Sequence, residues 1–97
     1  MLDINIRGSL DLIIDQMVGY LPTTVTFLRE GERKASLHID SEKDYTLGYA
    51  HGAIKASFLA IFISLKSRPP NPDETKEVDT IIYNRTDELR NAIFRGG

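Results

Sequence analysis

Apolar and polar residues follow two different periods in the first quarter of the chain. Over residues 2–7 every second residue is apolar, which predicts a half-buried strand. From residue 10 onward the apolar residues recur every three or four positions, the period of an amphipathic helix. They are Leu10, Ile13, Ile14, Met17, Val18 and Leu21. We expect this helix to begin after Ser9, a plausible N-cap, and to end near Gly19 and Pro22.

Residues 23–40 are rich in β-branched side chains and alternate again, which predicts a β-hairpin with one buried and one exposed face. The first strand would bury Val25 and Phe27. The second strand would bury Ala35, Leu37 and Ile39. The turn would lie at residues 29–32, where Gly31 can adopt a positive φ angle.

A long helix is predicted over residues 42–66. Ser41 and Asp44 have the spacing of a capping box, and no helix-breaking pair occurs before Pro69-Pro70. At 1.5 Å per residue such a helix is about 37 Å long.

A last helix is predicted to begin at Pro72, with Asn71 as its N-cap and acidic residues in its first turn. One face of this helix is apolar: Val78, Ile81, Ile82, Leu89, Ala92 and Ile93. The resulting order is β-α-β-β-α-α. We therefore expect a single α+β domain over residues 1–97, with a small, mainly antiparallel three-stranded sheet packed on the long central helix.

The long central helix is apolar almost all round. Its large side chains are Leu47, Ile54, Phe58, Ile61, Phe62 and Leu65. Elsewhere on the helix, small residues recur every four positions: Gly48, Gly52, Ala56, Ala60 and Ser64. We call this second set the small-residue ladder. Each glycine inside a helix costs about 0.8–1 kcal/mol relative to alanine, so two glycines one turn apart indicate a close approach.

Three occupants could approach the small-residue ladder. A neighbouring helix of the same domain could cover it, a second copy of the chain could pack on it, or a ligand could lie against Gly48 and Gly52. A small domain offers little else to cover such a helix, so we expect a homodimer.

Composition excludes several function classes. The 97 residues include no cysteine, which excludes disulfides, thiolate zinc sites and iron–sulfur clusters. The net charge of −2 lacks the basic excess of a dedicated nucleic-acid binder. No phosphate-binding glycine loop is evident, and we expect no cofactor.

Localisation follows from two further features. The first seven residues do not resemble a secretory signal, because they contain an acid and no basic stretch followed by an apolar run. The most apolar run, residues 56–65, is shorter than the roughly 20 residues that span a bilayer. We expect a cytoplasmic protein with no membrane partner.

A group of potential metal ligands surrounds the start of the central helix. It comprises His38, Asp40, Glu42, Asp44 and His51. Imidazole and carboxylate are suitable zinc ligands, but acids at a helix start are also stabilised by the helix dipole. We interpret these residues as a solvated strand face and a helix cap, and predict no metal site.

Candidate binding residues gather near the two ladder glycines. His51 is a weak candidate for acid–base catalysis because its ordinary pKa is near neutral. Arg85 interrupts the apolar face of the last helix, which indicates a structural ion pair, an anion-binding site, or a helix break near Asn84. The candidate ligand-binding set is Gly48, Tyr49, His51, Gly52, Lys55 and Arg85.

The leading functional hypothesis is a small cytoplasmic homodimeric binding or interaction module, such as a regulatory or accessory subunit. Its partners would be a second copy of itself and, as further candidates, another protein or a small anionic ligand. The alternative is a small enzyme or anionic-ligand-binding protein whose site lies at a subunit interface around His51 and Arg85. The sequence does not decide whether the protein is an enzyme.

Overall fold

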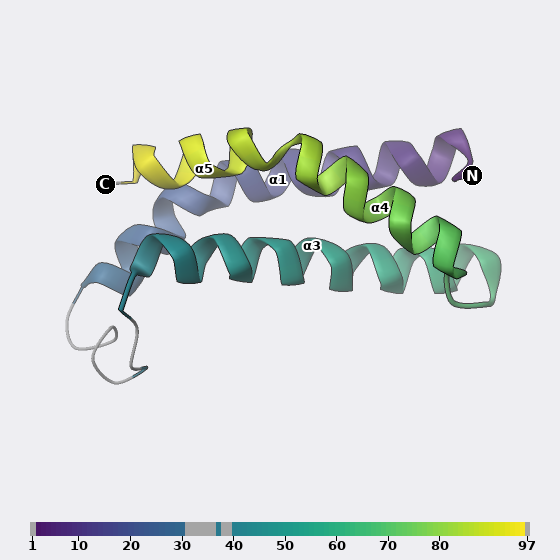
Figure 1. Ribbon diagram of the computed structural model, residues 1–97, viewed down its shortest axis with the longest axis horizontal. Coiled ribbons are helices and arrows are strands. Elements are labelled where there is room, and N and C mark those ends of the chain that lie inside the picture. The colour runs from purple at the N-terminus through teal and green to yellow at the C-terminus, as the bar shows by residue number, and fades with distance from the viewer. Residues whose placement is uncertain (1, 31–36, 38–39, 97) are drawn as a thin grey trace.

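The computed structural model describes residues 2–30, 37 and 40–96, and this part of the chain forms four helices. They are α1 (Ile4–Arg29), α3 (Glu42–Lys66), α4 (Pro72–Asn84) and α5 (Thr86–Arg95). Figure 1 shows α1 and α3 running antiparallel along the long axis, with α4 and α5 returning along them. The molecule is a flat rod of 43 × 23 × 18 Å.

The core lies between α1, α3 and the α4–α5 segment. The apolar stripe predicted for the first helix is confirmed: Leu10, Ile14 and Leu21 are buried, and the other three residues pack partly buried against them. The apolar face predicted for the last helix is also confirmed, since all six of its residues are buried. From α3, the buried apolar residues are Ala50, Ile54, Phe58 and Phe62.

The predicted α+β fold is wrong, because the described residues contain no strand. Residues 4–7, expected in the first strand, form the first turns of α1, and the side chain of Asp3 caps it by accepting from the Ile6 N–H at 2.9 Å. Leu2 and Ile6 are buried, whereas Ile4 is 84% exposed. Over so few residues a spacing of four fits both a strand and a helix, and only the exposure of Ile4 distinguishes them.

The predicted hairpin is also wrong where the structure describes it. Instead of ending near Gly19 and Pro22, α1 continues to Arg29. Val25 and Leu28 extend its buried stripe, while Phe27 is half exposed.

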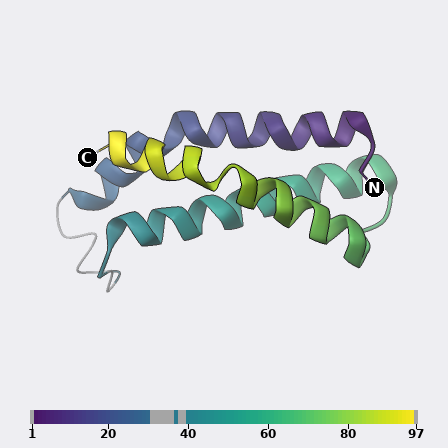
Figure 2. The same cartoon turned by 45° about the horizontal axis from the view of Figure 1, so that its top comes forward.

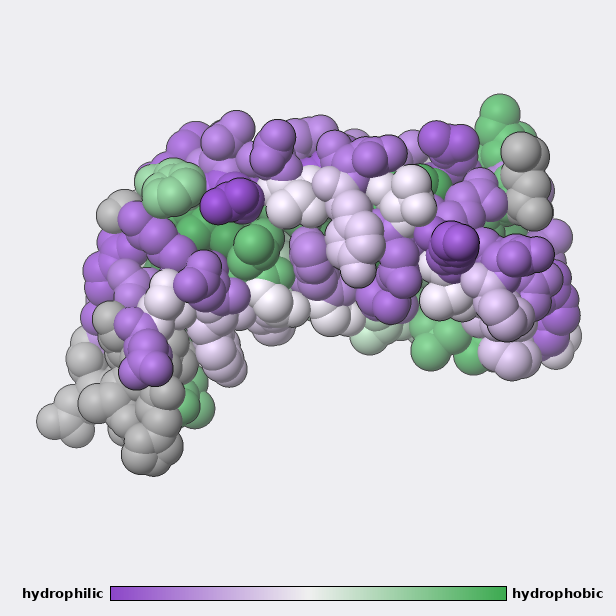
Figure 3. All heavy atoms as spheres, viewed as in Figure 1, coloured by the Kyte–Doolittle hydropathy of each residue, from purple (hydrophilic) through white to green (hydrophobic). Residues whose placement is uncertain are grey.

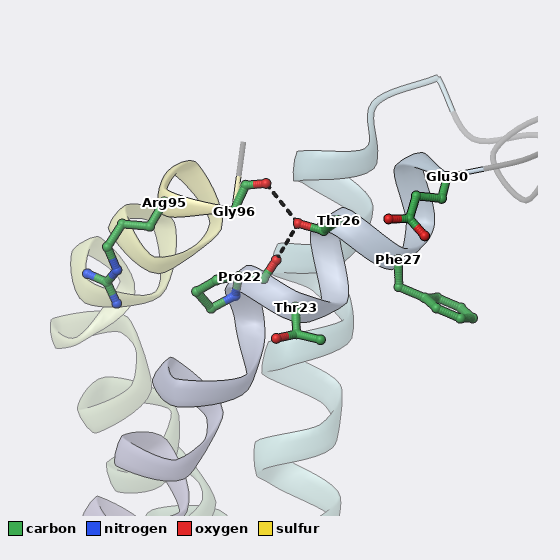
Figure 4. A pocket seen from close by; sticks show the side chains of 7 residues that line it. All are labelled: Pro22, Thr23, Thr26, Phe27, Glu30, Arg95 and Gly96. Atoms are coloured by element: carbon green, nitrogen blue, oxygen red, sulfur yellow. Dashed lines mark hydrogen bonds between the residues drawn. The ribbon is translucent and has the colours of Figure 1, made fainter.

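Pro22 is tolerated inside α1 because the helix bends at this turn, as Figures 2 and 4 show. Of the residues assigned to the second strand, Leu37 lies in a turn and is half exposed. Ala35, Ile39 and the turn residue Gly31 lie outside the described residues.

The predicted ends of the long central helix are confirmed. The Ser41 hydroxyl oxygen accepts from the Asp44 N–H at 3.2 Å, and α3 runs from Glu42 to Lys66. The helix ends at Ser67, which adopts the left-handed conformation with φ 55°.

The start of α4 follows the prediction, but the last helix is divided. The Asn71 side chain accepts from the Glu74 N–H at 2.8 Å, and the Glu74 carboxylate accepts from the Asn71 N–H at 2.9 Å. Arg68 donates two hydrogen bonds to the same carboxylate, at 2.8 and 3.2 Å. At Arg85 the helix breaks into α4 and α5, close to the break near Asn84 that the sequence had left open.

Candidate functional site

The small-residue ladder faces solvent. The buried residues of α3 form a row of their own with the same spacing of four: Thr46, Ala50, Ile54, Phe58 and Phe62. The ladder is offset from this row by two residues, which is a rotation of about 200° around the helix. It therefore lies opposite the core, and all five of its residues are exposed.

Large apolar residues flank the ladder. Tyr45, Tyr49, Leu59 and Ile63 are between 43% and 51% exposed. Together with the ladder they form what we call the outer face of α3. In Figure 3 the lower edge of the molecule, which α3 occupies in Figure 1, is mixed, with near-neutral and hydrophobic spheres beside hydrophilic ones.

No close neighbour explains the two ladder glycines. A Cβ atom built on Gly48 or Gly52 would meet no described atom within 4 Å outside its own helical turn. Among the described residues, no other helix of the same chain therefore covers the small-residue ladder, which was the first of the three possibilities for this surface.

The same helix has the length and composition to cross a membrane. Among the described helices α3 alone passes this test, and 28% of its most apolar window is buried inside the protein. Because core helices of soluble proteins pass the same test, this property alone is weak evidence.

His51 and Lys55 lie one turn apart on the side of α3 that meets α4. The Lys55 ammonium pairs with Asp79 at 2.9 Å, and the His51 ring lies 5.9 Å from the ring of Tyr83. His51 Nε2 is buried without a hydrogen-bond partner among the described residues. Among the described residues, no acid or base is therefore hydrogen-bonded to Nε2 of His51, the weak candidate for catalysis.

Arg85 is held by acceptors of the protein itself. It donates to Glu88 at 2.7 and 3.0 Å, to Asp15 at 2.5 Å and to the Asp11 carbonyl at 3.2 Å. The hydrogen bonds to Glu88, followed by the one to Asp15, raise the pKa of Arg85 above its ordinary value. The predicted structural ion pair is therefore confirmed, and it joins the α4–α5 break to α1.

The six candidate ligand-binding residues do not share one place. Gly48, Tyr49 and Gly52 lie on the outer face of α3, His51 and Lys55 face α4, and Arg85 faces α1. The geometry gives no support to one site built from His51 and Arg85 within a single copy of the chain.

Two hollows on the described surface have the size of a small-molecule site. The first, of about 450 Å³, lies at the end where α5 meets α1 (Figure 4). Its lining residues are Pro22, Thr23, Thr26, Phe27, Glu30, Arg95 and Gly96. The Thr26 hydroxyl lies 2.9 Å from the Gly96 carbonyl oxygen, whereas the Arg95 side chain turns away from the other residues. Because its titratable groups do not converge, this hollow is a weak candidate for catalysis.

The second hollow, of about 340 Å³, lies between α3, the Pro69-Pro70 linker and α4, and we call it the proline groove. It is lined by Lys55, Ala56, Phe58, Leu59, Pro69, Pro70, Thr75 and Val78. Of these residues only Lys55 was predicted as a ligand-binding residue. The proline pair signals a linker in the sequence, but the packing of α4 against α3 has no local signal.

No candidate metal centre is found in the part of the chain that the structure describes. No three His, Asp or Glu side chains there are close enough to hold an ion, and His38 lies outside that part. Comparisons with protein-family models, with curated proteins and with solved structures find no match to this chain.

Proposed function

We propose that this chain is a small cytoplasmic homodimeric interaction module whose copies pair through the outer face of α3. The observation that supports the proposal is the small-residue ladder, which faces solvent between four half-exposed large apolar side chains. Apolar surface of this kind on a soluble protein marks a surface for association. Glycine and alanine allow a second helix to approach more closely than the usual 8–10 Å between helix axes.

The ladder is self-complementary. In an antiparallel pair related by a two-fold axis at Ala56, Gly48 lies opposite Ser64 of the second copy and Gly52 lies opposite Ala60. In the same register Tyr49 lies opposite Ile63 of the second copy, so large side chains also meet large ones. A two-fold interface requires this self-complementarity.

Charge at the ends of α3 supports the same register. Asp44 and Lys66 are exposed near opposite ends of the helix, and the Lys66 ammonium also pairs with Asp3 of its own chain at 2.9 Å. An antiparallel pair places Asp44 of one copy near Lys66 of the other, and the two-fold axis repeats this contact at both ends. A parallel pair would bring like charges together at each end.

The shape of the molecule also supports association. The outer face, from Tyr45 to Ser64, runs for about 29 Å of the 43 Å length of the rod. Stable interfaces bury about 800 Å² per partner, and a face of this length is suited to that size.

Two features of α3 support a cytoplasmic dimer rather than a membrane helix. Ile54, Phe58 and Phe62 of the buried row are used in the protein core, so the outer face carries the five small residues of the ladder beside its half-exposed large ones. Lys55 lies near the middle of the helix, where a bilayer would penalise a charge by about 2.5–3.5 kcal/mol or more.

Sedimentation equilibrium from low to high micromolar concentration tests the proposal. We expect the wild type to dimerise and Gly52→Gln, which places a long polar side chain in the ladder, to remain monomeric. Gly19→Gln is the matched control, because Gly19 is also an exposed glycine with open space around it, but on α1.

Two results would contradict the proposal. The first is a wild-type chain that remains a 10.9 kDa monomer over the whole range. The second is a Gly52→Gln variant that associates as strongly as Gly19→Gln. If the wild type instead fractionated with membranes in cells, the cytoplasmic part of the proposal would be wrong.

A further inference from the structure

We propose that the proline groove binds a small monocarboxylate with an apolar body, such as a medium-chain fatty acid. The groove has the size and walls of a ligand site. Its volume of about 340 Å³ lies within the usual 300–1,000 Å³ of small-molecule pockets. At about 30 Å³ per water-sized group it accommodates roughly ten non-hydrogen atoms.

The walls of the groove are apolar and rigid. Phe58 of α3 and Val78 of α4 are each 2% exposed and connect the groove to the core. Pro69 and Pro70 form another wall, and their rings restrict the backbone on that side. A hydrocarbon chain or an aromatic ring would replace water along these surfaces without leaving a polar group unpaired.

Lys55 supplies the cation in the groove. Its side chain is 48% exposed, and its ammonium group contacts Asp79 at 2.9 Å. An ammonium group has three N–H donors, so Lys55 can pair with Asp79 and still donate to a ligand carboxylate. A ligand carboxylate can accept a hydrogen bond from this ammonium, and Asp79 beside it repels a singly charged ligand less than a dianion such as a phosphate monoester.

This inference does not require the proposed homodimer, although the two surfaces share an edge. Ala56 and Leu59 belong both to the groove and to the outer face of α3, but the remaining lining residues belong to the core side of α3, the linker and α4. Ligand binding is therefore expected in the monomeric Gly52→Gln variant as well as in the wild type.

Titration of the ¹⁵N-labelled full chain with octanoate, followed by amide chemical shifts, tests the inference. We expect saturable shifts at Thr75 and Val78, with weaker binding of octanol and none of octylamine. Lys55→Met should weaken octanoate binding by about three- to tenfold, since it removes one charge-assisted hydrogen bond. Lys76→Met is the matched control, because Lys76 is an exposed α4 lysine outside the groove lining and should change nothing.

Asp79→Asn provides the opposite test. It removes the carboxylate that competes for Lys55, so octanoate should bind more tightly than to the wild type. The inference is overturned if octanoate does not shift the groove residues, if Lys55→Met binds it as well as Lys76→Met, or if octanol binds as tightly as octanoate. Repeating the titration on Gly52→Gln separates this result from that of the dimer.

Discussion

Replacing Gly96 by alanine measures how closely the end of α5 approaches α1. A Cβ atom at this position would overlap the carbonyl oxygen of Pro22 and Cγ1 of Val25, and would lie 2.8 Å from Cα of Pro22. The φ angle of Gly96 is an ordinary −77°, so the expected effect is steric and not conformational. Two of the three neighbouring atoms belong to the backbone of Pro22, and backbone atoms cannot rotate away as the end of a side chain can.

The magnitude follows from this geometry. Overpacking of this kind costs about 1–3 kcal/mol. If the end of α5 instead swings away, the hydrogen bond between the Thr26 hydroxyl and the Gly96 carbonyl is lost, at about 0.5–1.5 kcal/mol, together with the contact to Val25. We therefore expect Gly96→Ala to lower the free energy of unfolding by about 1–3 kcal/mol.

The assay is urea unfolding followed by far-UV circular dichroism, at a concentration low enough for the chain to be monomeric. Gly52→Ala is the control, because it makes the same chemical change where no described atom lies within 4 Å. That variant should raise the free energy of unfolding by about 0.8–1 kcal/mol, the difference in helix propensity. The reasoning is refuted if Gly96→Ala is as stable as the wild type, or if Gly52→Ala is less stable than it.

Three further predictions concern the α3–α4 corner. Ser67→Gly should raise the free energy of unfolding by about 1 kcal/mol, because Ser67 ends α3 with φ 55°, where glycine has no steric penalty; equal or lower stability in thermal unfolding would contradict this. Phe62→Ala should lower the free energy of unfolding by about 3–5 kcal/mol, because Phe62 is 0% exposed; a loss below about 1 kcal/mol in urea unfolding would show that its site collapses or is hydrated. The hydrogen bonds from Arg68, followed by the one from the Asn71 N–H, lower the pKa of Glu74 to about 2. Because the folded-state pKa is depressed, the stabilisation by Glu74 is complete above the unfolded value of 4.5 and is lost as the pH falls towards about 2. Over this pH window the free energy of unfolding of the wild type should therefore decrease more steeply than that of Glu74→Gln. Parallel pH profiles of the two proteins would refute the assignment.

Local signals in the sequence were sufficient for the ends of two helices. Ser41 and Asn71 cap α3 and α4 through hydrogen bonds to residues three positions away, and such contacts depend only on the neighbouring sequence. The apolar stripes were predicted for the same reason, because a period of three to four residues identifies the buried face of a helix before its partner is known.

The strands were predicted wrongly because a local pattern supported two answers. Leu2 and Ile6 are four apart, which suits one face of a strand and also one face of a helix. In the region after Pro22, β-branched residues and a proline favoured a hairpin, but burial of Val25 and Leu28 against the rest of the core stabilises a continued helix. A propensity of a few tenths of a kcal/mol per residue is smaller than the gain from burying such side chains.

The sequence by itself determined that α3 has one row of large residues and one of small residues, because that division depends only on spacing along the helix. Only the tertiary structure decided which side is covered: α1 and α5 pack on the side that carries Ile54, Phe58 and Phe62, whereas Leu65 at the end of the helix and the ladder are exposed. The proline groove and the pairing of Arg85 with Asp15 also required the tertiary structure, since each joins residues that are distant in the chain. Contacts of this kind depend on how whole helices pack against one another. The local sequence pattern around each residue therefore does not predict them.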